Sequence, residues 1–182
     1  MSAGNDQLTN TSYVLLGFLA PHAHSGYDIK RGADHSTRFF WQISYGQIYP
    51  ELKHLVELGL AEQETGSRGG RTRHLYRITE AGRAALIGWL GERKGPSTFE
   101  MRDELLLKLF FCDAAGPGAK GIILEQMRLR EEAIIAEFRA MQPHAIEAAA
   151  DHGPTMLEVL QGGIKIHQAY LTHLKELEQN LS

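Results

Sequence analysis

Two strand-like runs, residues 60–65 and 72–78, interrupt an otherwise helical N-terminal half, and this interruption constrains the fold more than any other feature. The segment GSRGGR joins them, and its glycines permit positive φ angles without fixing a compact two-residue turn. Segments with helical periodicity and capping residues flank the hairpin: residues 12–20, 25–38, 44–58 and 79–90. The order of three helices, a hairpin and a helix predicts a winged helix-turn-helix over residues 8–91.

The segment SYGQIYPELKHLVEL, which begins at Ser44, combines a strong helical pattern with a glycine and a proline. Ser44 and Gln47 match a capping box, and apolar side chains recur on one side of the helix. Pro50 cannot donate a hydrogen bond to the carbonyl of Gly46, which costs an exposed helix up to about 3 kcal/mol. Gly46 and Pro50 lie on the side opposite the apolar one, so that side carries small side chains with polar side chains around them. A surface of this shape fits a DNA major groove about 12 Å wide. The alternative is a core helix whose polar face contacts only water.

The polar and aromatic residues of this helix are the candidate contacts to bases and phosphates: Ser44, Tyr45, Gln47, Tyr49 and Lys53. The net charge of the chain is only −3, so any nucleic-acid signal must lie in the distribution of charge. From Thr65 to Thr79 the hairpin carries four arginines, one histidine and no acidic residue. Arginine is favoured at phosphates and in narrow minor grooves. We therefore expect phosphate or groove contacts from Arg68, Arg71 and Arg73 of the wing, and a phosphate contact from Arg38, just before the helix that starts at Ser44. A solvated basic hairpin is the alternative.

The polar segment GERKGPST, residues 91–98, predicts a linker, and residues 92–182 predict an all-helical domain. Two long helices in this domain carry heptad-like apolar seams. The seams consist of Ile123, Met127, Ile134, Phe138, Met141 and Ala145, and of Leu157, Leu160, Ile164, Leu171, Leu174 and Leu177. The seams either pair within the chain or form a dimerisation arm. We favour the dimer, because two helices alone cannot cover both apolar seams and the apolar residues that flank them.

Other classes of protein find little support in the sequence. One cysteine, Cys112, excludes an intramolecular disulfide, and no apolar run is long enough to span a membrane, so we expect a cytoplasmic protein. The sequence contains no phosphate-binding glycine loop, nucleophile elbow or HExxH motif, so we expect neither an enzyme nor a cofactor. His22 and His24 lack neighbouring ligands that would complete a metal site, so no metal is expected there.

Several segments together resemble the PadR family of transcriptional regulators: YVLLGFLA, SGYDIKR, ISYGQIYPELKHLVELGLAE, HLYRITEAGRAAL and RDELLLKLFF. They cover nearly all of residues 12–111, and YGQIYPELKHLVELGL is the most specific. The resemblance implies a homodimer, joined through its C-terminal helices, that binds a two-fold symmetric operator in double-stranded DNA and usually represses a neighbouring gene. In several members of the family small aromatic acids or multidrug-type compounds relieve repression, but no ligand motif carries over to this sequence, so the effector stays open. Trp41 and Trp89 are candidates to line a pocket unless they belong to the core. A metal-responsive winged-helix regulator and a winged-helix protein-interaction module remain as alternatives.

Overall fold

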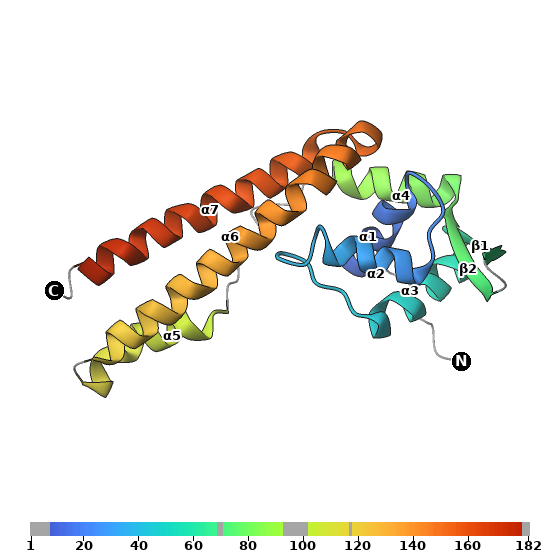
Figure 1. The fold of residues 1–182 in the computed structure, drawn as a ribbon. Coiled ribbons are helices and arrows are strands. Elements are labelled where there is room, and N and C mark those ends of the chain that lie inside the picture. The colour runs from blue at the N-terminus through green and yellow to red at the C-terminus, as the bar shows by residue number, and fades with distance from the viewer. Residues whose placement is uncertain (1–7, 69–70, 93–101, 117, 180–182) are drawn as a thin grey trace, which may run out of the picture. The chain divides into compact units, whose positions relative to one another are not determined.

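The structure is a computed structural model that describes residues 8–68, 71–92, 102–116 and 118–179. The chain divides into two compact units, Met1–Gly95 and Pro96–Ser182 (Figure 1). Most of the linker expected at residues 91–98 lies outside the described residues. The predicted fold class is confirmed, because a mostly helical chain carries a two-stranded antiparallel sheet between its third and fourth helices.

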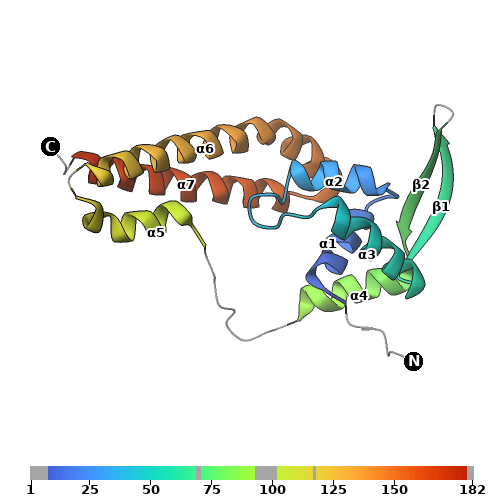
Figure 2. The ribbon, with the colours of Figure 1, turned by 90° about the horizontal axis from the view of Figure 1, so that it is seen from below.

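The N-terminal unit contains four helices and one hairpin, in the predicted order. They are α1 (Asn10–Leu19), α2 (Gly26–Asp34), α3 (Tyr45–Glu57), β1 (Ala61–Arg68), β2 (Arg71–Ile78) and α4 (Glu80–Gly91). The hairpin extends away from the helices of this unit (Figure 2). Side chains that cap the helices explain several of these boundaries: Thr9 caps α1, Ser25 caps α2 and Thr79 caps α4.

The second helix is shorter than the sequence pattern predicts, and the expected end near residue 38 is wrong. α2 ends at Asp34, and the following residues form turns. The His35 ring lies 2.7 Å from the carbonyl oxygen of Arg31, and the Ser36 hydroxyl donates to the carbonyl of Gly32 at 2.7 Å. The backbone N–H groups of residues 36–38 all donate to the single carbonyl of Ala33, so regular helical hydrogen bonding ends after Asp34.

The wing strands are longer than expected. Paired positions run from Ala61 opposite Ile78 to Arg68 opposite Arg71, which leaves two residues between the strands. The prediction that GSRGGR forms a wider loop is therefore wrong. Glycine and serine adopt the extended conformation without strain, and the antiparallel ladder satisfies their backbone groups. The connecting residues 69–70 themselves lie outside the described part of the chain.

In the C-terminal unit a long helical hairpin carries a shorter helix. The elements are α5 (Glu104–Phe111), the 3-10 helix η1 (Cys112–Ala115), α6 (Ala119–His152) and α7 (Thr155–Gln179). α6 and α7 run antiparallel along most of their length, and α5 lies beside α6 (Figures 1 and 2). Both predicted seams face inward, with Met127 of α6 and Leu174 of α7 fully buried. A Cβ atom at Gly163 would lie 2.9 Å from the Phe138 ring, so this glycine permits a close helix crossing.

None of the described helices combines the length and the apolar character needed to cross a membrane.

Candidate nucleic-acid interface

One face of α3 is fixed firmly to the core of the N-terminal unit. Ile48, Leu52 and Leu55 have no exposed surface. The buried hydroxyl of Ser12 in α1 also donates a hydrogen bond to the Glu51 carboxylate at the edge of this face. Burial of three large aliphatic side chains stabilises this orientation by about 1.5–3 kcal/mol each. The opposite face of α3 must therefore point outward.

The capping box predicted at the start of α3 is present. The Ser44 backbone N–H donates to Gln47 Oε1 at 2.9 Å, and the Ser44 hydroxyl lies 3.0 Å from the same oxygen. This arrangement satisfies one of the orphan donors at the helix start. It also commits the carbonyl half of the Gln47 amide to the cap, so its NH₂ group is the part suited to a base edge.

The outward face of α3 has the shape expected from its sequence. Tyr45 and Tyr49 are 43% and 49% exposed, and their rings stack with centroids 6.2 Å apart. Gly46 and Pro50 are exposed between and beside them, and a Cβ atom at Gly46 would meet only the Ser44 hydroxyl, at 3.7 Å. This open backbone permits close approach of another molecule, while the two tyrosines offer hydroxyl groups at its rim.

The two cationic candidates near α3 have different surroundings. Lys53 is exposed, and its Nζ lies 3.5 Å from the Glu57 carboxylate one turn later, so part of its charge is offset. Arg38 is exposed in the turn before α3, and its guanidinium carbon lies 4.7 Å from the centre of the Phe39 ring. This cation–π contact places the Arg38 guanidinium beside the segment that connects α2 and α3.

The wing brings its arginine positions together at one end of the hairpin. Arg68 and Arg71 are directly paired across the strands, and Arg73 pairs with Gly66 one step further along. Arg77 lies nearer the core, where its Nε donates to the Glu64 carboxylate across the strands at 3.1 Å. Three of the four arginine positions of the wing therefore lie towards the tip in the strand register.

The two tryptophans do not occupy comparable positions. Trp89 of α4 stacks on Tyr13 of α1, with ring centroids 4.7 Å apart and planes tilted by 7°, and it packs against the N-terminal core. Trp41 is partly exposed just before α3. Packing explains Trp89 without a ligand, whereas nothing in its surroundings assigns a role to Trp41.

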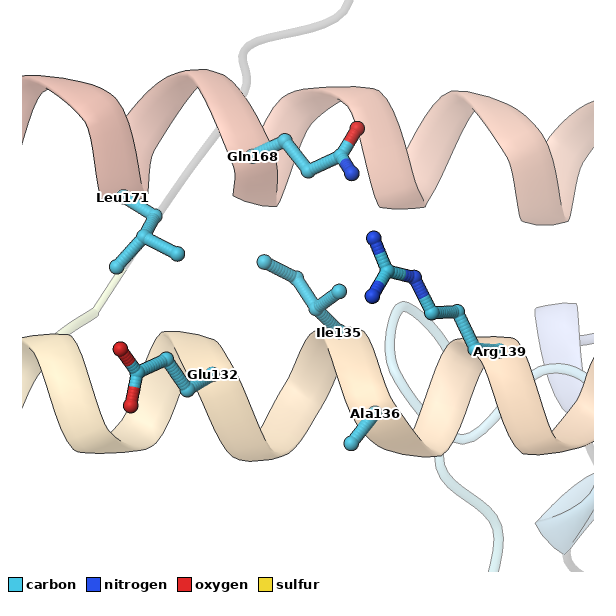
Figure 3. Close-up of a pocket in the computed structure, with 6 residues that line it drawn as sticks. All are labelled: Glu132, Ile135, Ala136, Arg139, Gln168 and Leu171. Carbon is cyan, nitrogen blue, oxygen red and sulfur yellow. The ribbon is translucent and has the colours of Figure 1, made fainter.

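A pocket of about 260 Å³ lies between α6 and α7 (Figure 3). Gln168 and Leu171 point from α7 towards Ile135 and Arg139 of α6 (Figure 3). Glu132 and Ala136 complete the lining. The lining thus combines aliphatic side chains with one guanidinium group, from Arg139, and one carboxylate, from Glu132.

The C-terminal unit contains a buried polar cluster that the sequence patterns did not predict. Glu131 is only 1% exposed, and its carboxylate oxygens lie 2.6 Å from His167 Nδ1 and 3.0 Å from Arg130 Nε. Arg130 also binds both carboxylate oxygens of Asp103, at 2.8 and 2.7 Å. The missed signal is the position of Glu131 and His167, each of which falls within an apolar seam of its helix, where only a buried partner makes a polar side chain tolerable.

Over the described part of the chain, no group of three or more His, Cys, Asp or Glu side chains is placed to hold a metal ion. The rings of His22 and His24 do lie close together, with centroids 4.6 Å apart.

Known families account for nearly the whole chain. Residues 15–87 match the "Transcriptional regulator PadR-like family", and residues 101–182 match "Virulence activator alpha C-term". The negative transcriptional regulator PadR of Bacillus subtilis (strain 168) is 31% identical over 121 residues, which are 65% of this chain and 66% of the relative. The chain belongs to the PadR-like family. Its members are transcriptional regulators rather than enzymes.

Solved structures extend the likeness of this PadR-like chain to its whole length. The crystal structure of Bacillus subtilis PadR in complex with operator DNA has a TM-score of 0.86 at 23% identity, over 97% of this chain and 99% of that one. The complex of the same protein with p-coumaric acid has a TM-score of 0.77 at 22% identity, over 96% and 98% of the two chains. The likeness confirms the winged-helix fold.

Proposed function

We propose that this PadR-like chain is a homodimeric, sequence-specific repressor that binds a two-fold symmetric operator and is released by a small effector molecule. The proposal rests on the two different faces of α3. One face buries three leucine and isoleucine side chains in the core, and the other exposes two stacked tyrosines. A helix fixed in this way can enter a major groove without losing its packing.

Each part of the surface has a distinct role in this proposal. The hydroxyls of Tyr45 and Tyr49 and the amide NH₂ of Gln47 contact base edges, which provides sequence preference. Ser44, Lys53, Arg38 and the wing arginines contact phosphates, which provides most of the affinity. In a two-fold dimer the two α3 helices enter successive major grooves, roughly 34 Å apart.

The wing arginines are tested by the salt dependence of binding. We expect Arg71→Ala to weaken binding to operator and random DNA alike, by about tenfold at low salt, because a phosphate contact carries no sequence information. The slope of log K against log[salt] should become less steep by about one per protomer. Fluorescence anisotropy titrations at several salt concentrations measure both quantities.

Lys165→Ala is the matched control, since it removes one exposed positive charge from α7 in the other compact unit and should leave the slope unchanged. If Arg71→Ala keeps the wild-type affinity and slope on both DNAs, the wing does not bind phosphate. A wild-type protein that fails to distinguish DNA upstream of its own gene from random DNA would favour the protein-interaction alternative.

The proposal of a homodimer rests on apolar side chains that the intrachain hairpin leaves uncovered. Phe110 of α5 is 79% exposed. Exposed apolar residues also recur at seven-residue spacing on the two long helices: Ile122 and Leu129 on α6, and Val159 and Ile166 on α7. A second copy of the chain would cover these exposed apolar residues, and two-fold dimers are the commonest soluble assemblies.

Substitution of one of these residues should dissociate the dimer. We expect Ile166→Glu to weaken self-association by at least about a hundredfold, because each copy would bury an unpaired charge. Ile87→Glu makes the same exchange at an exposed isoleucine of α4 and should leave the dimer intact. Sedimentation equilibrium gives the mass. A dimer that persists in Ile166→Glu would exclude this face of α7 from the interface.

The proposed effector is a small aromatic acid, and the proposed mode of regulation is repression. Bacillus subtilis PadR is described as a negative regulator and has been solved with p-coumaric acid, which supports repression relieved by an aromatic acid. In the pocket between α6 and α7, Arg139 is the group that could pair with a carboxylate, although Glu132 lies in the same lining. Titrating p-coumaric acid, and separately zinc, into the protein–DNA complex separates an aromatic-acid response from a metal response. A reporter gene under the operator gives the sign.

A further inference from the structure

The ring of Tyr49 rests directly on a glycine of the preceding helix. A Cβ atom at Gly26, the first residue of α2, would lie 2.7 Å from Tyr49 Cε1, 3.0 Å from Cζ and 3.3 Å from Cδ1. Carbon atoms in contact are normally about 3.5–4.0 Å apart, so any side chain larger than hydrogen would displace the ring by roughly 1 Å. Only glycine leaves room for the ring in its present position.

The backbone beneath Tyr49 is held on two sides. His24 forms an isolated bridge with Tyr76 of β2, in which its N–H donates at 3.0 Å and its carbonyl accepts at 2.8 Å. The buried Ser25 caps α2, and its hydroxyl accepts from the Asp28 N–H at 3.2 Å. Gly26 follows directly and is itself buried. The surface on which the ring rests is therefore fixed both to the wing and to α2.

Tyr49 also lies close to the buried base of the wing. Burial raises the pKa of the Tyr76 hydroxyl, and the neighbouring Tyr49 raises that pKa further. Tyr45 stacks on Tyr49, with the ring planes tilted by 17°. The Tyr49 ring thus contacts both Gly26 and Tyr45, and half of its surface stays available to a partner.

We infer that Gly26 is a positioning residue for DNA reading, which sets the place of the Tyr49 ring and hydroxyl on the outward face of α3. The inference rests on the proposed function, in which Tyr49 contacts base edges. The part of Tyr49 nearest Gly26 is the far end of a flexible, half-exposed side chain. An added methyl group at Gly26 therefore moves the ring instead of straining the backbone, so sequence preference should change while stability does not.

A double-mutant cycle tests this inference. Wild type, Gly26→Ala, Tyr49→Ala and the double variant are titrated with an operator fragment, selected by binding from the source genome, and with random DNA of equal length. We expect each single change to lower the ratio of operator to random affinity by about tenfold, within the range for loss of one base contact. In the Tyr49→Ala background, Gly26→Ala should alter that ratio by less than about twofold, because neighbours that act together are not additive.

Stability is followed separately through tryptophan fluorescence during urea unfolding, since Trp41 and Trp89 both lie in the N-terminal unit. Gly26→Ala should unfold at the wild-type urea concentration or slightly above it, because alanine loses less entropy than glycine on folding. Gly17→Ala is the matched control: a Cβ atom there meets nothing within 4 Å, and both DNA affinities should stay unchanged.

The outcomes separate the two hypotheses. If Tyr49→Ala keeps the wild-type discrimination, the proposed reading role of Tyr49 is wrong, and the inference about Gly26 is lost with it. If Tyr49→Ala loses discrimination but Gly26→Ala does not, only the positioning role is overturned. A Gly26→Ala effect that persists without the Tyr49 ring, or that comes with a marked loss of stability, would likewise overturn it.

Discussion

Gly82→Ala should destabilise the N-terminal unit by about 3 kcal/mol or more. A Cβ atom at Gly82 would lie 2.0 Å from the backbone carbonyl oxygen of Leu60 and 3.0 Å from Ile78 Cγ1. That carbonyl cannot move away freely, because it accepts a hydrogen bond from the Thr79 N–H at 3.1 Å. Relief of the overlap would require α4 to separate from the hairpin, and such overpacking typically costs 1–3 kcal/mol and sometimes more.

Urea unfolding followed by tryptophan fluorescence measures this effect, because both tryptophans lie in the affected unit. Gly88→Ala is the control in the same helix: a Cβ atom there meets nothing within 4 Å. It should stabilise the unit by about 0.5–1 kcal/mol, because alanine is the better helix former. An unfolding midpoint for Gly82→Ala equal to that of wild type would show that α4 and the hairpin are not in close contact.

The junction at Gly82 also links stability to DNA binding. Thr79 donates its hydroxyl to the Gly59 carbonyl at 2.8 Å and accepts from the Gly82 N–H at 3.0 Å, so α3, the wing and α4 meet there. Loosening this junction would change the angle between α3 and the wing. The proposed contacts to base edges and to phosphates depend on both elements at once, so we expect a change at this junction to weaken DNA binding as well as folding.

Local rules were enough to predict much of the N-terminal unit. The Ser44–Gln47 capping box and the apolar spacing of Ile48, Leu52 and Leu55 fix both the start of α3 and its buried face, because each depends on residues within four positions. The outward position of Tyr45 and Tyr49 follows from the same periodicity. The candidate contacts to DNA remain predictions, since their exposure permits contact without demonstrating it.

Features that depend on contacts between distant residues were not predictable in this way. The contact between Tyr49 and Gly26 joins residues 23 positions apart, and nothing in the local sequence pattern marks that glycine as a contact. The early end of α2 depends on a turn in which the N–H groups of residues 36–38 converge on the Ala33 carbonyl, and no capping residue in the sequence marks that turn. The length of the wing strands depends on pairing across the hairpin, which the glycines of GSRGGR neither require nor forbid.

The polar cluster beneath α5 should contribute as much to the C-terminal unit as Gly82 does to the N-terminal unit. Asp103 caps α5 by accepting from the N–H groups of Leu105 and Leu106, at 2.9 and 3.2 Å. Arg130 joins this cap to the buried Glu131, which in turn contacts His167 of α7. One guanidinium therefore holds three helices together through two carboxylates, one of them almost fully buried.

Arg130→Ala should lower the stability of the C-terminal unit by about 2–3 kcal/mol at neutral pH, because it leaves Glu131 buried with less compensation. The hydrogen bonds from Arg130 also hold the pKa of Asp103 below its usual range. A lowered pKa in the folded state means that the stabilisation is present above about pH 4 and is lost as the pH falls below it. The difference between variant and wild type should therefore shrink in acid.

Urea unfolding followed by circular dichroism at pH 7 and at about pH 3 measures both parts of this prediction, because the C-terminal unit contributes the long helices and contains no tryptophan. Arg128→Ala is the matched control, since Arg128 pairs with Glu132 and Glu178 at the surface and should cost much less. A loss for Arg130→Ala no larger than that for Arg128→Ala would mean that water, and not Arg130, compensates the Glu131 charge. Equal losses at both pH values would instead assign the effect to packing of the Arg130 side chain.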